Sequence, residues 1–143
     1  MIIKKTNIVR EWTDFSRTYV GIINELDTHL QSKYKLSLSE FSVLWLLSEQ
    51  PEQRMRIQYI AESVNLSQSA ISRLVSRLEN NFVKRHICLD DQRGVYIKLT
   101  TLGEEKVNEM TSSYQDHLIQ LLTKSNISQD MTKLLSTLTV LIK

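Results

Sequence analysis

The most constraining feature of the sequence is a stripe of apolar residues that runs from Ile8 to Leu30. Its members recur at steps of four or three residues, the period of one face of an α-helix. They are Ile8, Trp12, Phe15, Tyr19, Ile22, Leu26 and Leu30. A second stripe of helical period lies between Met131 and Ile142. The pattern predicts a long amphipathic helix at each end of the chain.

Shorter helices are predicted between these two stripes. Ser37 and Glu40 have the spacing of a capping box, which predicts a helix over about 41–48. Apolar residues at helical spacing predict a third helix over 57–64. A polar turn then leads into a fourth helix over 68–80. Asn81 is the residue type that tolerates left-handed backbone, so it is expected to end the fourth helix in that conformation.

The period of the sequence changes after the fourth helix. Residues 83–89 and 95–99 are predicted to form two short strands, since apolar and polar residues alternate in the second. A polar turn containing Gly94 joins them. Thr100 or Thr101 then caps a fifth helix, and Ser128 is expected to cap a sixth. The order predicts a mainly α fold with a small β-hairpin wing: a winged helix-turn-helix with six helices.

Composition excludes several other classes of protein. A chain of 143 residues with 41% hydrophobic and 24% charged residues is expected to fold as one globular domain. Its three glycines are isolated, so neither a Walker A loop nor a dinucleotide-binding fingerprint can form. The single cysteine, Cys88, excludes an internal disulfide framework. No apolar run is long enough to span a membrane, so a soluble, cytoplasmic protein without membrane partners is expected.

Charge is unevenly distributed along the chain. Residues 54–98 contain eight basic and four acidic side chains, a net charge of +4, whereas the flanks together carry −2. A basic middle between mildly acidic ends is typical of a protein in which one surface meets a polyanion.

The exposed face of the fourth helix suits the major groove of DNA. Short polar side chains and an arginine can reach base edges without steric bulk, and the predicted base-reading residues are Gln68, Ser69, Ser72 and Arg73. Phosphate contacts are expected from Arg77, Lys84 and Arg85, while Arg93 at the hairpin tip could enter a minor groove. A merely solvated helix face is the alternative, which the hairpin and the charge distribution argue against.

Residues 64–105 resemble the MarR family of winged-helix transcription regulators. The matching segments are the fourth helix with its preceding turn, 64–79, and the hairpin 91–100 followed by Gly103. The resemblance implies an Asp-x-Arg element in the wing, here Asp91 and Arg93, in which the aspartate orients the arginine. The sequence departs from the family pattern at Asn81, where glycine is usual, and at the base of the wing, which is apolar.

The terminal helices need a partner, because their apolar stripes exceed what a small helix-turn-helix core can cover. A two-fold dimer would bury both, and the resemblance implies dimerisation through the first and last helices. The whole chain, 1–143, is therefore predicted to be a single domain. Its dimerisation helices are expected over about 8–33 and 101–143, and its DNA-binding lobe over about 37–100.

The resemblance also implies a small lipophilic or phenolic effector. Candidate lining residues are Tyr19, His29, Tyr34 and Trp45, although packing in the core or interface is the alternative role for each. Some relatives sense oxidants through cysteine, but the neighbours of Cys88 favour an ordinary half-buried strand residue. The three histidines, His29, His86 and His117, are scattered in the sequence, so no metal, no cofactor and no catalytic set is expected.

These observations predict a homodimeric, sequence-specific regulator that binds double-stranded DNA, a repressor acting on a pseudo-palindromic operator and released by a small ligand. Two alternatives remain open at this level. One is an effector-free DNA-binding regulator, and the other is a winged helix that binds protein and not DNA. An enzyme is the remote third.

Overall fold

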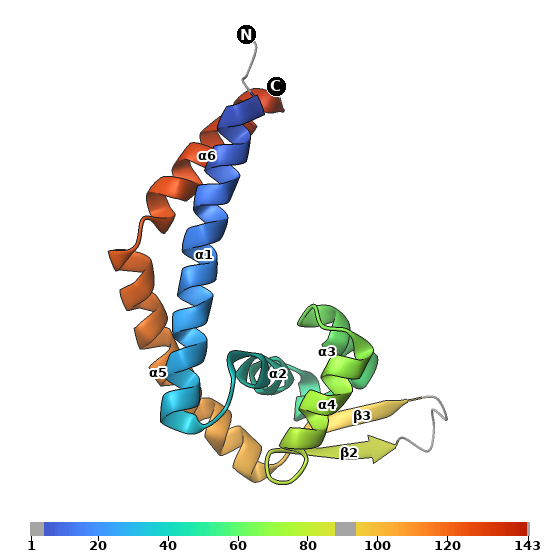
Figure 1. Cartoon of the computed structure of the whole chain (residues 1–143). Coiled ribbons are helices and arrows are strands. Elements are labelled where there is room, and N and C mark those ends of the chain that lie inside the picture. The colour runs from blue at the N-terminus through green and yellow to red at the C-terminus, as the bar shows by residue number, and fades with distance from the viewer. Residues whose placement is uncertain (1–4, 88–93, 143) are drawn as a thin grey trace. The chain divides into compact units, whose positions relative to one another are not determined.

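The computed structural model describes residues 5–87 and 94–142 (Figure 1). Within these ranges the chain forms six α-helices, one short 3₁₀ helix and a three-stranded antiparallel sheet, so the predicted fold class is confirmed. The elements are α1 (Lys5–Tyr34), α2 (Leu38–Ser48), η1 (Pro51–Gln53), β1 (Arg54–Arg56), α3 (Ile57–Ser63), α4 (Gln68–Leu78), β2 (Val83–Ile87), β3 (Val95–Leu99), α5 (Thr101–Lys124) and α6 (Ile127–Leu141). The described chain divides into two compact units, each containing part of α1 and of α5.

One unit comprises Leu30–Ser113 and holds the helix-turn-helix with the sheet. Most of the buried apolar side chains lie here, contributed by α2, α3, α4 and the strands. The predicted capping box is present: Ser37 Oγ accepts a hydrogen bond from the Glu40 N–H at 3.1 Å, and Glu40 Oε1 accepts one from the Ser37 N–H at 2.9 Å. Both orphan amides at the start of α2 are thereby satisfied.

The sheet has the strand order β1–β3–β2, and its strands β2 and β3 are labelled in Figure 1. Its inner face is apolar, with Val83 and Ile97 fully buried and Leu99 5% exposed. The strand β1 was not predicted, because a segment of only three residues is too short to show an alternating period. It pairs with β3 over Arg54–Lys98, Met55–Ile97 and Arg56–Tyr96. The wing is thus part of a three-stranded sheet rather than an isolated hairpin.

A close backbone approach fixes the start of α5. Thr100 Oγ1 accepts a hydrogen bond from the Gly103 N–H at 2.9 Å, so Thr100 and not Thr101 caps this helix. A side chain at Gly103 would place its Cβ 2.1 Å from the carbonyl oxygen of Phe82. Glycine is therefore required where α5 crosses the chain segment that enters β2.

The other unit comprises Met1–His29 and Tyr114–Lys143. Thr18 Oγ1 donates to Asp130 Oδ2 at 2.8 Å, and Thr137 Oγ1 donates to Glu11 Oε2 at 2.5 Å. The two contacts are seven residues apart on α1 and on α6, which sets the helices antiparallel in one register. Among the described residues of this unit, only Ile22, Leu26 and Ile127 are buried apolar side chains.

Two predicted helix ends are wrong. Asn81 does not have left-handed backbone; the described non-glycine residues with positive φ are Lys35, Glu52, Gln53 and Asn65. The Phe82 N–H still bonds the Leu78 carbonyl at 2.9 Å, so a right-handed turn continues past α4. Ser128 does not cap α6, which begins at Ile127. Ser125 Oγ accepts from the Ile127 N–H at 3.3 Å instead.

Candidate nucleic-acid interface

A tight turn positions α4 against α3. Asn65 adopts φ 57°, the left-handed region that asparagine tolerates better than most residues. The next N–H, that of Leu66, bonds the carbonyl of Ala61 at 3.1 Å. Ser67 then caps α4 by accepting from the Ala70 N–H at 3.2 Å. The sequence predicted both the polar turn and its serine cap, although it placed the left-handed residue at Asn81.

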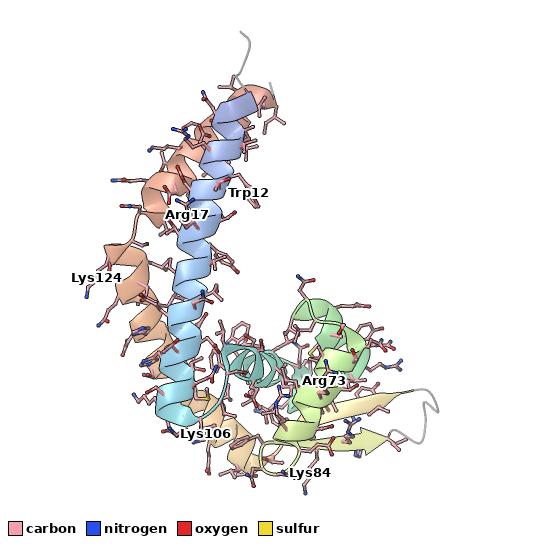
Figure 2. The ribbon with its side chains drawn as sticks, viewed as in Figure 1. Trp12, Arg17, Arg73, Lys84, Lys106 and Lys124 are labelled. Carbon is pink, nitrogen blue, oxygen red and sulfur yellow. The ribbon has the colours of Figure 1, made fainter. Side chains whose placement is uncertain are left out.

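The helix α4 separates cleanly into a buried and an exposed face. Its four buried side chains, each no more than 2% exposed, are Ile71, Leu74, Val75 and Leu78. Its exposed side chains are Gln68, Ser69, Ser72, Arg73, Ser76 and Arg77. Figure 2 shows Arg73 extending from this helix. All four predicted base-reading residues therefore lie on one solvent-facing surface of short polar groups and arginine.

Arg77 is held at the edge of that surface. Its Nε lies 3.9 Å from Glu40 Oε2, and its side chain remains 59% exposed. Because Glu40 also closes the capping box of α2, one carboxylate links the start of α2 to the exposed face of α4. The guanidinium keeps donors available to solvent, as a phosphate contact requires.

The strand β2 brings two predicted cations beside α4. Lys84 is exposed, and its position near the start of β2 is visible in Figure 2. Arg85 points to the other face of the strand, where it forms an ion pair with Glu79 through Nε and Oε1. Its Nη2 also donates to Ser76 Oγ at 3.4 Å. Arg85 therefore connects the sheet to the last turn of α4, a role that the sequence did not indicate.

The tip of the wing lies outside the described residues. The predicted Asp-x-Arg element, Asp91 and Arg93, falls there, and so does Cys88. The two strands that lead to the tip are described and pair from Val83–Leu99 to Ile87–Val95.

Two arginines that were not predicted as site residues lie on the sheet. Arg54 and Arg56 of β1 have their guanidinium carbons 5.0 and 5.5 Å from the ring centre of Tyr96 on β3. Arg56 Nε also donates to the Tyr96 hydroxyl at 3.2 Å. The only sequence signal for this group is the alternation of Arg54, Met55 and Arg56, which places the two arginines on one face of a strand.

The four proposed effector residues divide between the two units. Tyr19 and His29 lie on the part of α1 in one unit, whereas Tyr34 and Trp45 lie in the other. Tyr19 is 51% and Trp45 43% exposed, so neither is a core residue of the single chain. Tyr34 is half-buried, and its hydroxyl donates to the Glu109 carbonyl at 3.4 Å.

Two of the three histidines, although scattered in the sequence, lie against each other in the structure. The rings of His29 on α1 and His117 on α5 stack with their centres 4.2 Å apart and their planes at 5°. Residues far apart in sequence meet because these two helices run side by side. Within the described ranges, no three His, Cys, Asp or Glu side chains lie close enough together to hold a metal ion. In the same ranges, no helix combines the length and apolar character needed to cross a membrane.

Solved structures similar to this chain include MarR family transcriptional regulators. The chain is similar to AbsC, a MarR family regulator from Streptomyces coelicolor, at 24% identity with a TM-score of 0.79 over 99% of this chain and 95% of that one. It is similar to Sco3205, a MarR family regulator from the same organism solved in complex with DNA, at 25% identity and TM-score 0.76 over 92% and 82%. A variant of MarR from E. coli, complexed with operator DNA, matches at 22% identity and TM-score 0.70 over 90% of each chain.

A family model matches more than half of the sequence. Residues 25–110 match the model described as transcriptional regulator SarA/Rot. The matched segment contains α2, the helix-turn-helix, the sheet and the start of α5. The chain therefore belongs to the SarA/Rot family of transcriptional regulators, and its winged-helix fold is that of the MarR family.

Proposed function

We propose that the protein is a sequence-specific regulator that binds double-stranded DNA as a homodimer. The observation that carries this proposal is the exposed face of α4, where polar side chains and arginines cover a helix whose large apolar residues are all buried. Gln68, Ser69, Ser72 and Arg73 lie toward its N-terminal end, the part of a recognition helix that contacts base edges. Sco3205 and a MarR variant, which share this fold, were solved in complex with DNA, and this supports DNA binding by the present chain.

Phosphate contacts supply the affinity in this proposal. Arg77 on α4 and Lys84 on β2 are exposed cations. Arg85 holds β2 against α4 and adds positive charge there, while Asp91 and Arg93 are proposed to act at the wing tip. These contacts fix the register of the protein on the duplex, and they release counterions, so binding weakens as salt rises.

The proposed dimer uses α1 and α6. On α6 the exposed apolar side chains Met131, Leu135, Leu138 and Ile142 recur at steps of four and three. They lie on a different side of the helix from Asp130 and Thr137, which contact α1. On α1, the exposed apolar side chains are Val9, Trp12, Tyr19 and Val20. A second copy that covers these surfaces would remove them from water and supply a two-fold axis for a palindromic site.

Repression, release by a small ligand and a cytoplasmic location belong to the same proposal. A bound regulator that covers promoter DNA excludes other proteins from it, which makes repression the simplest direction of control. Tyr19 and Trp45 offer exposed aromatic surface with a polar tip, the chemistry that binds a phenolic effector.

Selection from a random pool of DNA duplexes tests the proposal. The purified protein is incubated with the pool at physiological salt, and the retained duplexes are sequenced. The expected result is a pseudo-palindrome with half-sites about one helical turn, ~10 bp, apart. Ser72→Glu, which places a carboxylate on the base-reading surface, is the matched control and should enrich nothing. Failure of the wild-type protein to retain any duplex would favour a winged helix that binds protein.

A further inference from the structure

The strand register gathers positive charge on the outer face of the sheet. Side chains of directly paired residues in antiparallel strands point to the same face. One row across the sheet is Arg54–Lys98–Lys84, and the next row is Arg56–Tyr96–His86. Neighbouring strands are about 5 Å apart and alternate residues about 7 Å apart, so the rows form one small surface. The opposite face is the buried one that holds Val83 and Ile97.

The charges on this outer face repel one another. Lys84 and Lys98 are direct cross-strand partners, and Lys98 is also paired with Arg54. Like charges directly opposite each other destabilise a sheet. The three strands contain no acidic residue. Arg54 has an acidic partner from outside the sheet: its Nε lies 3.0 Å from Oε2 of Glu52, a residue of the adjoining 3₁₀ helix. Among the described residues, neither lysine has a carboxylate within 4 Å. A bound polyanion would relieve this repulsion.

Tyr96 orders the arginine side of the surface. Both guanidinium groups lie within about 5.5 Å of its ring centre, and Arg56 is bonded to its hydroxyl. Stacking on an aromatic ring restricts the conformations of an arginine side chain. Part of the conformational entropy cost of binding an anion is thus met before the anion arrives.

A hollow adjoins the lysine side of the surface. It has a volume of about 530 Å³ and lies between β2, β3 and the start of α5. Its polar lining includes Lys84, His86, Lys98, Asn81, Thr100 and Thr101. Cations next to hydroxyl donors are the groups that hold phosphate oxygens.

This surface borders the strand that contacts the proposed recognition helix. The strand β2 forms the edge of the sheet, and Arg85 ties it to the last turn of α4. Lys84, the preceding residue of the same edge strand, lies on its outer face. None of the six side chains in the two rows is aliphatic, whereas a protein partner would need an apolar centre to its interface.

We propose that the outer sheet face, through Arg54, Arg56 and Lys98, binds backbone phosphates of duplex DNA outside the bases that α4 reads. The proposal rests on the proposed function, since α4 must first place the duplex beside the sheet. It extends the protein's footprint to flanking DNA of any sequence. The face contributes affinity and salt dependence but no base specificity.

Lys98→Gln tests this with two duplexes: the selected operator alone, and the operator extended by about one helical turn, ~10 bp, on each side. Wild-type protein should bind the longer duplex more tightly, with a steeper loss of affinity as salt rises. A dimer of the variant lacks about two phosphate contacts, so its slope of log K against log salt on the longer duplex should be shallower by about 1.8. Between 50 and 200 mM salt, the affinity of the variant for the longer duplex should therefore fall about 12-fold less than that of the wild type. Affinity for the short operator should be unchanged.

Lys124→Gln is the matched control, since Lys124 is an exposed lysine of α5 in the other unit. It should leave both slopes as in the wild type. Equal slopes for wild type and Lys98→Gln on the longer duplex would overturn the proposal, as would an equal change on both duplexes. Loss of binding to a poly-glutamate peptide, with both duplexes unaffected, would assign the face to an acidic protein instead. A wild-type protein that binds neither duplex would overturn the proposed function itself.

Discussion

Arg85 on β2 forms an ion pair with Glu79, the C-cap residue that follows Leu78 at the end of α4. The same guanidinium donates to Ser76 Oγ one turn earlier, at 3.4 Å. The edge strand of the wing and the proposed recognition helix are therefore joined by one side chain. A shift of β2 would displace the C-terminal turn of α4, so the two elements proposed to contact DNA are expected to move together.

Lys84→Ala and Arg85→Ala are expected to separate two roles of adjacent cations. Lys84→Ala should weaken binding to all duplexes alike and make the salt slope of a dimer shallower by about 1.8. Its free energy of unfolding should stay within about 0.5 kcal/mol of the wild type. Arg85→Ala breaks a pair that is more than a third exposed at the arginine, so it should cost no more than about 1 kcal/mol. Urea unfolding and salt titrations check this; a wild-type salt slope for Lys84→Ala, or a loss clearly above about 1 kcal/mol for Arg85→Ala, would contradict it.

Gly103→Ala and Gly21→Ala should change stability in opposite directions. A Cβ at position 103 would meet the Phe82 backbone, so Gly103→Ala is expected to cost about 1–3 kcal/mol through overpacking. Nothing lies within 4 Å of a Cβ at Gly21 inside α1, and alanine there should stabilise by about 0.5–1 kcal/mol. Urea unfolding of both variants provides the comparison. A tolerated alanine at 103 would show that the start of α5 does not require the close approach.

Tyr114 is expected to make the protein sensitive to alkali. Burial, with a smaller contribution from Tyr19, raises the pKa of the Tyr114 hydroxyl above its ordinary value of about 10. The folded state then holds this proton more tightly than the unfolded state, so stability falls as pH rises from about 10 toward the folded pKa. In urea unfolding, the free energy of unfolding of Tyr114→Phe should fall less between pH 8 and pH 10.5 than that of the wild type. The control Tyr59→Phe, at an exposed tyrosine, should retain the wild-type decline; equal declines in both variants would contradict the assignment.

Leu135→Glu should dissociate the proposed dimer. Leu135 is 56% exposed and lies in the apolar stripe of α6, so a carboxylate there would be buried without a partner in the dimer. Lys133→Glu is the control, because at 3.6 residues per turn Lys133 lies about 160° around the helix from Leu135. Sedimentation equilibrium should give a monomer for Leu135→Glu and a dimer for Lys133→Glu. A dimeric Leu135→Glu protein would place the interface elsewhere.

The helices and the reading face could be predicted because their signals are local. Ile71, Leu74, Val75 and Leu78 repeat at helical spacing, and all four are buried. The serine cap of α4 also follows from a residue type at one position. Such features need no knowledge of what the rest of the chain does.

The features that the sequence did not predict depend on distant contacts. The strand β1 exists because β3 pairs with Arg54–Arg56, and nothing within those three residues predicts that partner. The His29–His117 stack and the Arg85–Glu79 pair also require segments to be brought together by the fold. The charge count did include Arg54 and Arg56, but only strand register shows that they share a face with Lys98.

The central claim is that the exposed face of α4 reads bases. It is tested most directly by measuring the affinity of Arg73→Ala and Arg77→Ala for the selected operator and for a scrambled duplex at one salt concentration. Arg73→Ala is predicted to lose about 1–3 kcal/mol, roughly 5- to 150-fold, on the operator and far less on the scrambled duplex. Arg77→Ala should weaken both equally. An equal loss on both duplexes for Arg73→Ala would make it a phosphate contact and contradict base reading by this face.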